Sequence, residues 1–120
     1  MKKINIPNAF AQLDGPYQPK IAGDIDDFQV KIALIDGPFD WHKHVAEDEA
    51  FFVVEGEMVM EFRDHQIALS QGDFLVVPKN TEHRPNAASP CKVMVLEKST
   101  VLNTGDVTTD KTIEDVPYVA

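Results

Sequence analysis

The segment WHKHVAEDEAFFVVEGE, residues 41–57, places two histidines and several acids immediately before an apolar run that ends at a glycine. On a β-strand the side chains of residues i and i+2 point to the same face. His42 and His44 would therefore aim both imidazoles at one point, and AFFVV at 50–54 has the length and composition of a buried strand. The segment predicts a polar site beside a buried β-strand.

Further acidic and imidazole side chains can complete this site. Glu47, Asp48 and Glu49 precede the apolar run, and a hairpin turn would bring one of these carboxylates to the face of the histidine pair. His83 follows the strand-like run DFLVVP, whereas His65 lies in the turn RDHQ and is expected to be exposed. Three imidazoles and one carboxylate are a typical ligand set for a divalent transition metal. The same residues are also compatible with exposed histidines and a solvated acidic loop.

Short apolar runs of strand length recur at regular intervals from residue 28 onward. In FQVKIALID (28–36) the apolar residues from Phe28 to Leu34 recur at every second position, the pattern of a half-buried strand. The further runs are AFFVV (50–54), MVMEF (58–62), QIAL (66–69), DFLVVP (73–78) and CKVMVLE (91–97). Turn-forming residues separate these runs, which show no helical periodicity. The pattern predicts an all-β fold, an antiparallel sandwich or barrel.

A chain of 120 residues, 43% of them apolar, is long enough for one domain with a core and too short for two. Residues 1–27 contain several prolines and glycines, so helices are not expected there, although a short edge strand around Ile4–Ile6 or Lys20–Ala22 is compatible with the pattern. Residues 99–120 are polar, and they either wrap around the barrel edge or extend into solvent. We expect a single domain, 1–120, with a barrel over about 28–98, an N-terminal arm and a C-terminal tail.

Charge and cysteine content argue against several classes of partner. The formal net charge of −9 disfavours nucleic acid and anionic membrane surfaces, because phosphate binding needs clustered Lys and Arg. No apolar run approaches the roughly 18 residues of a membrane span, and MKKINIPNAF at the N-terminus has no apolar signal-peptide core. Cys91 is the single cysteine, is expected to be buried without a catalytic role, and cannot form an internal disulfide. We expect a cytoplasmic protein with no nucleic-acid or membrane partner.

The spacing of these residues resembles the first motif of the cupin family. That motif is Gly, five residues, His-x-His, three or four residues, Glu, six residues and Gly. Here Gly37 precedes His42 and His44 with one residue fewer, Glu49 follows after four residues, and Gly56 follows after six.

The second cupin motif, Gly, five residues, Pro-x-Gly, two residues, His, three residues and Asn, also has a counterpart. Gly72, Pro78 and His83 match it, while Asn80 replaces the middle glycine and Ala87 replaces the final asparagine. Asn tolerates the left-handed backbone that a turn glycine adopts. None of these departures falls on a ligand position of the family.

The resemblance implies a double-stranded β-helix, the jelly-roll barrel of the cupins, with His42, His44, Glu49 and His83 as ligands of one divalent transition metal. The metal stays open among Mn, Fe, Co, Ni, Cu and Zn, since this ligand set accepts each of them. The phrase HKHVAEDEAFFVVEGE also resembles the small single-domain cupins labelled mannose-6-phosphate-isomerase-like. That label describes a similarity of sequence and establishes no activity.

Strand parity predicts what surrounds the metal. Phe51 lies two residues after the carboxylate ligand, and Met58, Met60 and Phe62 share one face of the next strand, so these four residues are predicted to line an apolar pocket. Glu61 is the one candidate general base within the strands, and its orientation stays open. No residue is assigned a catalytic role.

A phosphosugar substrate would need a cation inside the pocket. Arg84 adjoins an inward-pointing ligand and is therefore expected to face outward. The orientations of Lys31, Arg63 and Lys92 are undetermined. A phosphosugar is accordingly disfavoured.

We expect a metal-dependent enzyme that acts on a small, mostly apolar molecule by oxygenation, isomerisation or hydrolysis. The alternatives are a non-catalytic module that binds or senses a small ligand or the metal, and a scaffold that the metal stabilises. A homodimer is expected, because the outward strand faces carry Phe52, Val54, Met94 and Leu96.

Overall fold

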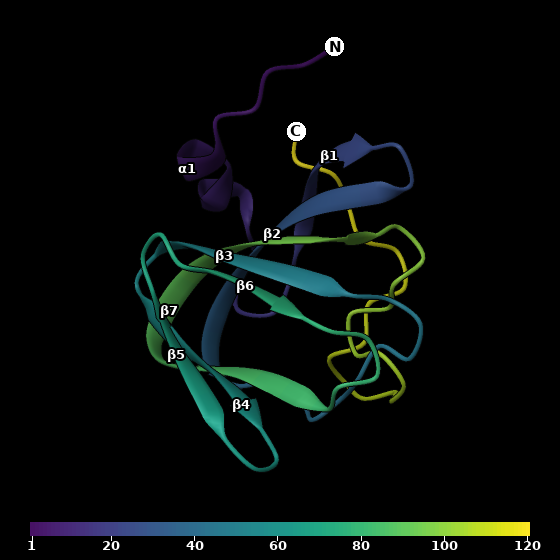
Figure 1. The fold of residues 1–120 in the computed structure, drawn as a ribbon. Coiled ribbons are helices and arrows are strands. Elements are labelled where there is room, and N and C mark those ends of the chain that lie inside the picture. The colour runs from purple at the N-terminus through teal and green to yellow at the C-terminus, as the bar shows by residue number, and fades with distance from the viewer.

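The longest strand, β7 (His83–Lys98), organises the barrel because three other strands pair with it. The computed structural model describes all 120 residues (Figure 1). The C-terminal half of β7 lies between β2 (Phe28–Pro38) and β3 (Glu49–Glu55). Its N-terminal end pairs with β4 (Glu57–Phe62).

The other three strands extend these pairings at the edges. β1 (Lys20–Ile25) pairs with β2, β6 (Phe74–Val77) pairs with β3, and β5 (Gln66–Ser70) pairs with β4. The resulting strand order is β1-β2-β7-β3-β6, with β4 and β5 joined to the same sheet through β7. All pairings between these strands are antiparallel, which confirms the predicted all-β antiparallel fold.

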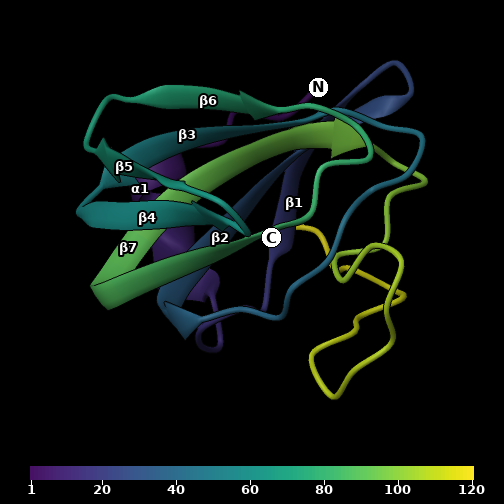
Figure 2. The same cartoon turned by 60° about the horizontal axis from the view of Figure 1, so that its bottom comes forward.

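The strands curl into a barrel, as the turned view in Figure 2 shows. Their inward side chains form one hydrophobic core. The core residues come from β2 to β7 and are Ala33, Ile35, Phe51, Val53, Met58, Met60, Leu69, Val77, Ala87, Cys91, Val93 and Val95. Burial of these side chains is the main favourable contribution to barrel stability.

Strand β2 is apolar on both faces, and the structure shows which face is internal. Lys31, Ala33 and Ile35 point into the barrel, whereas Ile32 is fully buried on the opposite side. The predicted alternation is present, but the apolar set from Phe28 to Leu34 lies on the outer face. That face is covered in part by the N-terminal arm, which explains its apolar composition.

The N-terminal arm contains a helix that the sequence analysis did not expect. α1 (Ile6–Ala9) is followed by a 3-10 turn at Phe10–Gln12. Pro7 is compatible with it because the first helical N–H groups have no intrahelical acceptor, and the side chain of Asn5 caps the start by accepting from the Asn8 N–H at 2.9 Å. The helix therefore replaces the strand considered at Ile4–Ile6, while the alternative at Lys20–Ala22 forms part of β1.

A second apolar cluster fixes this arm to the barrel. Its buried members are Ala9, Phe10, Ile32 and Val119, with Val54 and Met94 packed against them. Two of the four residues expected to face a partner subunit thus pack against a cluster of the chain's own residues.

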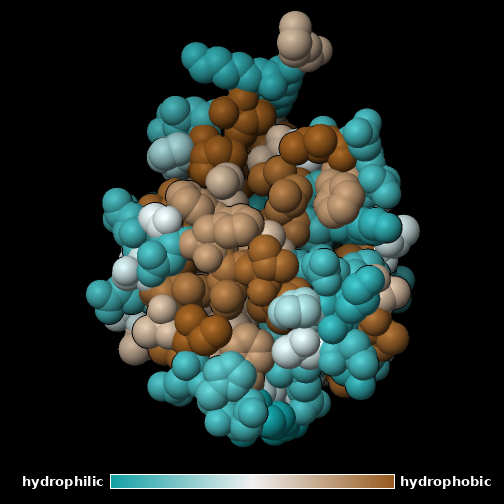
Figure 3. Space-filling view, in the orientation of Figure 1, coloured by the Kyte–Doolittle hydropathy of each residue, from teal (hydrophilic) through white to brown (hydrophobic).

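The outer surface of β2, β7, β3 and β6 nevertheless keeps a continuous apolar area, visible near the centre of Figure 3. We call it the outer apolar face, and it includes Val30, Ala50, Phe52, Phe74, Met94 and Leu96. Phe74 is the most exposed of its large side chains, at 61%.

The C-terminal tail wraps around the barrel, which decides between the two expectations for residues 99–120. Near its end, the Ile21 N–H donates to the carbonyl of Pro117 at 2.8 Å, and the Val119 N–H donates back to the carbonyl of Ile21 at 2.9 Å. None of the helices is long and apolar enough to cross a membrane.

Candidate metal centre

Three segments of the chain bring the predicted ligands together. His42 and His44 lie between β2 and β3, Glu49 is the first residue of β3, and His83 is the first residue of β7. The four donor atoms lie within 4.8 Å of one another, and all four residues are buried. Glu47 and Asp48, the alternative acids, are not part of this cluster.

The two histidines of the His-x-His pair lie on a loop and not on a regular strand. An isolated bridge holds this loop, because the His42 N–H donates to the carbonyl of His83 at 3.1 Å and the His83 N–H donates to that of His42 at 2.9 Å. This bridge brings residues from distant parts of the sequence into one site. It also places the rings of His42 and His83 4.5 Å apart, centroid to centroid.

Backbone carbonyls set the orientation of two imidazole rings. Nδ1 of His42 lies 2.9 Å from the carbonyl oxygen of Asp40, and Nδ1 of His83 lies 2.8 Å from that of Thr81. A carbonyl only accepts, so each Nδ1 carries the proton and each Nε2 keeps its lone pair. Metal-ligating histidines are commonly held in this way, through a hydrogen bond from the ring nitrogen that does not bind the metal.

The third imidazole supplies the strongest sign that a group belongs here. Nε2 of His44 is buried and has no hydrogen-bond partner, although it lies 3.3 Å from Oε1 of Glu49. Nε2 of His83 lies 3.4 Å from the same oxygen. Two ligand atoms each about 2.1 Å from one ion are separated by roughly 3.0–3.4 Å at tetrahedral or octahedral angles. The residues present therefore fit one divalent transition metal, whose identity the donor set leaves open.

Burial and mutual contacts favour the protonation states that a metal requires. Burial, together with the neighbouring His83, lowers the pKa of His42 to about 4. Burial alone would raise the pKa of Glu49, but contacts with Glu97, His44 and His83 outweigh it and hold this pKa well below its ordinary value. At neutral pH the site thus offers a neutral imidazole and an ionised carboxylate, the forms that bind metal ions.

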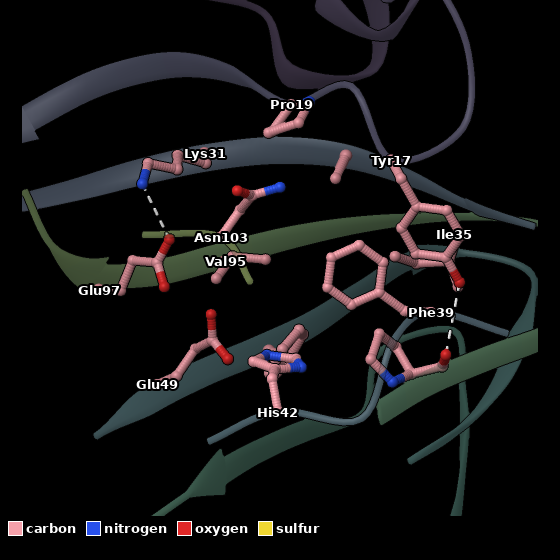
Figure 4. Close-up of a pocket in the computed structure, with 13 residues that line it drawn as sticks. Tyr17, Pro19, Lys31, Ile35, Phe39, His42, Glu49, Val95, Glu97 and Asn103 are labelled. Atoms are coloured by element: carbon pink, nitrogen blue, oxygen red, sulfur yellow. Dashed lines mark hydrogen bonds and ion pairs between the residues drawn. The ribbon is translucent and has the colours of Figure 1, made fainter. Parts of the chain in front are cut away.

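A cavity of about 70 Å³ adjoins the cluster and is shown in Figure 4. Its lining residues are Tyr17, Pro19, Lys31, Ala33, Ile35, Phe39, His42, Glu49, Phe51, Pro85, Val95, Glu97 and Asn103. Two predicted ligands, His42 and Glu49, therefore contact the space that a substrate would occupy. Most of the wall is apolar.

The predicted pocket lining differs from this wall in three residues. Phe51 lines the cavity. Met58 and Met60 point inward, as strand parity predicted, but they fill the solid core at 3% and 0% exposure. Phe62 is half-buried, packs against that core and stacks on His65, with the ring centroids 4.6 Å apart. The cavity lies between β2, β3, β7 and the tail, so strand β4 contributes none of its lining.

A buried ion pair inside the cavity was missed by the sequence analysis. Nζ of Lys31 lies 2.9 Å from Oε1 of Glu97, and the two side chains are 5% and 3% exposed. Burial and the charge of Glu49 raise the pKa of Glu97 well above its ordinary value. Parity could have found both residues, because Lys31 shares a face with the inward Ala33 and Glu97 shares one with the inward Val95. The pocket is therefore less apolar than predicted.

The remaining cations and the suggested base lie outside the cavity. Arg84 and Asn86 bind Glu61 at 2.9 and 2.7 Å, which removes Glu61 from the candidates for a general base. Arg63 pairs with Glu82, and Lys92 pairs with Glu55. Lys31 is thus the one cation that lines the cavity.

Two residues predicted to have no catalytic role also lie apart from the cavity lining. The side chain of His65 is 56% exposed and contacts Asp64. Cys91 is buried, and burial raises the pKa of its thiol to about 11. A thiol with this pKa is almost fully protonated at neutral pH and is a poor nucleophile.

Comparison with known proteins agrees with the geometry. Residues 35–97 match the cupin domain model, which is more than half of the chain. The chain belongs to the cupin family. Among solved cupin structures, a cupin-2 domain containing protein from Shewanella frigidimarina is 37% identical with a TM-score of 0.77, covering 79% of this chain and 93% of that one. The predicted jelly-roll barrel is confirmed.

Two further relatives cover different shares of this cupin. Protein NMB1881 from Neisseria meningitidis is 31% identical with a TM-score of 0.75, covering 82% of this chain and all of the other. The uncharacterised protein YdbB of Bacillus subtilis is 42% identical over 62 residues, which is 51% of this cupin and 55% of YdbB. The chain thus spans about half the length of this curated relative.

The departures from the cupin motifs leave the site intact. Asn80, at the position of a motif glycine, has a φ of +59°, the left-handed conformation that the turn needs. Its N–H donates to the carbonyl of His44 at 2.7 Å, so this turn also supports the loop that carries the ligands. Gly37, which precedes the shortened spacing, also has a positive φ of +71°.

Proposed function

We propose that this cupin is a metal-dependent enzyme that acts on a small molecule, with one divalent transition metal held by His42, His44, Glu49 and His83. The observation that carries the proposal is the buried Nε2 of His44, which has no partner in a cluster whose other donors point to the same place. An unpaired buried polar atom lowers stability, so its retention is explained by a ligand that it binds.

The chain's own residues would hold the substrate beside this cluster and keep water from it. Phe39 and Phe51 form part of the apolar wall, and both are almost fully buried. The carbonyls of Asp40 and Thr81 hold two imidazoles in fixed orientations, which keeps the donor atoms preorganised. When bound, the metal would supply Lewis-acid or redox chemistry at a substrate oxygen. Oxygenation or isomerisation of a compact molecule with an apolar body fits this arrangement best.

A non-catalytic module that binds the metal or a small ligand is the second candidate. It is favoured by the cavity volume of about 70 Å³, which lies far below the roughly 300–1,000 Å³ of sites for drug-sized ligands. An enzyme with this cavity would act on a molecule of few heavy atoms.

The same proposal includes membership of the mannose-6-phosphate-isomerase-like group of cupins and a cytoplasmic location. Membership of the mannose-6-phosphate-isomerase-like group is supported by the phrase HKHVAEDEAFFVVEGE. A reducing cytoplasm suits the one cysteine, which is buried and free.

Metal content and metal-dependent turnover test the proposed function together. The protein is purified without added metal, analysed for elements, and compared with His44→Ala and the control His65→Ala. We expect one ion per chain in the wild type and in the control, and a large loss in His44→Ala. Equal metal content in all three proteins would refute the site.

The reconstituted Fe(II) and Mn(II) forms are then assayed for oxygen uptake with small diketones and catechols, and for isomerisation of sugar phosphates. An enzyme loses turnover with a chelator and regains it with one metal. A metal-loaded protein that binds a metabolite tightly and turns nothing over would instead be the binding module.

A further inference from the structure

The proposed function leaves one buried feature of the cavity unused, the pair formed by Lys31 and Glu97. The two residues come from adjacent strands and both line the cavity beside Glu49. In Figure 4 they lie at the end of the cavity away from Tyr17, and one oxygen of Glu49 points toward Glu97. By the register of β3 and β7, in which Ala50 is opposite Leu96, Glu49 is opposite Glu97.

This pair has hydrogen-bonding capacity that the protein does not fill. An ammonium group has three donors, and the contact with Glu97 Oε1 is the one hydrogen bond found for Nζ of Lys31. Oε2 of Glu97 has no partner other than the neighbouring carboxyl group of Glu49. Lys31 therefore offers unused donors to a molecule in the cavity.

The other polar groups in the wall outside the metal cluster have partners. The hydroxyl of Tyr17 donates to the carbonyl of Gly37 at 2.5 Å. The side chain of Asn103 donates to the carbonyl of Lys111 and accepts from the Ile113 N–H. The unfilled polar contacts of the cavity are thus at the metal cluster and at the Lys31–Glu97 pair.

Barrel stability does not account for the pair. A buried ion pair is generally no more stabilising than well-packed apolar side chains of similar volume, because both charges lose their hydration. The pair is better explained by a ligand that needs it.

The charges at the site select the kind of ligand. A divalent ion and the Lys31 ammonium supply three positive charges, against at most two negative charges from Glu49 and Glu97. The site therefore keeps at least one positive charge whichever form Glu97 takes, and it is complementary to a monoanion. A single ammonium in a cavity of about 70 Å³ suits a carboxylate better than a phosphate dianion, which needs more donors and more room.

We infer that Lys31 binds the carboxylate of a small carboxylic acid, while a second oxygen of the same molecule faces His42, His44, Glu49 and His83. This inference rests on the proposed function and names its substrate class. It revises the expectation of a mostly apolar substrate, because the pocket contains a cation. Lys31 is then a specificity-determining residue that separates acids from their neutral analogues.

Binding of lactate and of its uncharged analogue lactamide tests the inference by calorimetry on the metal-loaded protein. A charge-assisted hydrogen bond is worth roughly tenfold or more in affinity, so lactate should bind at least about ten times more tightly than lactamide. The variant Lys31→Met/Glu97→Leu removes both charges and should reduce this preference to about twofold or less. Lys92→Met is the matched control, because Lys92 pairs with Glu55 outside the cavity. It should keep the full preference.

Several binding results would contradict the inference. Equal affinity for both probes in the wild type, no measurable lactate binding, or a preference that persists in the double variant would overturn the inference. Tighter, Lys31-dependent binding of inorganic phosphate would overturn the carboxylate class. If the double variant does not fold, Lys31→Gln/Glu97→Gln takes its place, with the same expectations.

Elemental analysis of the same samples distinguishes this inference from the proposed function. Absence of metal would refute the proposed function. Lactate binding is therefore also measured on metal-free protein, where any preference for the acid that remains must still depend on Lys31.

Discussion

Replacing His44 by leucine should make the metal-free protein more stable while it abolishes metal binding. The side chain of His44 is 4% exposed, and its Nε2 has no hydrogen-bond partner. Leaving such an atom unsatisfied costs about 1–3 kcal/mol, and leucine of similar volume removes that cost. Glu49 keeps its contacts with His83 and Glu97, so its carboxylate does not become isolated. Glu49 also loses its 3.3 Å contact with His44, so the net gain is smaller, and we expect His44→Leu to raise the free energy of unfolding by about 1 kcal/mol in the presence of a chelator.

Urea denaturation with and without metal measures both effects. With metal at about 100 times its Kd, the wild type should gain about 2.7 kcal/mol, whereas His44→Leu should gain almost nothing. The control His65→Leu changes an exposed side chain, so it should shift stability by less than about 1 kcal/mol and keep the metal response. A metal-free His44→Leu protein that is clearly less stable than the wild type would show that Nε2 of His44 is not an unpaired ligand atom.

Three other predictions concern pH, the tail and assembly. The pKa of His42 is about 4 in the folded protein against about 6.5 in the unfolded chain. As pH falls from 6.5 to 4, the unfolded chain binds a proton that the folded protein does not, so the free energy of unfolding of the metal-free protein should fall by about 3 kcal/mol. His42→Gln should flatten this pH dependence in urea titrations. Gly105 has a φ of +57°, and a Cβ there would lie 2.3 Å from the carbonyl oxygen of Lys43. Gly105→Ala should therefore lower the free energy of unfolding by at least roughly 1–2 kcal/mol and weaken metal binding. Gly23→Ala is the control, because Gly23 has open space around it, and it should have neither effect. The outer apolar face should pair with that of a second copy, so light scattering should give the mass of a dimer. Phe74→Asp should reduce this mass to that of a monomer. A monomeric wild type at micromolar concentration would rule out the dimer.

Most of what the sequence predicts about the metal-ligand cluster comes from the spacing of residues that are close together in the chain. His42, His44 and Glu49 lie within eight consecutive residues, so their proximity hardly depends on the rest of the fold. The strands were predictable because alternation and turn residues are local signals as well. Pro7 was taken as a helix breaker, although in the first turn it is tolerated.

The ion pair and the shape of the cavity depend on long-range packing, which one sequence does not reveal. Lys31 and Glu97 are 66 positions apart and meet only through the register of β2 on β7. Because β2 is apolar on both faces, its composition does not say which side is internal. Met58 and Met60 were correctly predicted to point inward, but strand parity cannot tell a filled core from a wall with space beside it.

The order in which the chain is synthesised matters for the tail. The Lys43 N–H donates to Oδ1 of Asp106 at 2.9 Å, and the Asp106 N–H donates to the carbonyl of Lys43 at 3.0 Å. Two hydrogen bonds therefore anchor the middle residue of the His-x-His pair to a segment that leaves the ribosome about sixty residues later. Until this segment has been made, the histidine loop lacks its clamp. Metal loading is accordingly expected to follow synthesis of Asp106, so that a later segment of the chain controls when the first ligands become fixed.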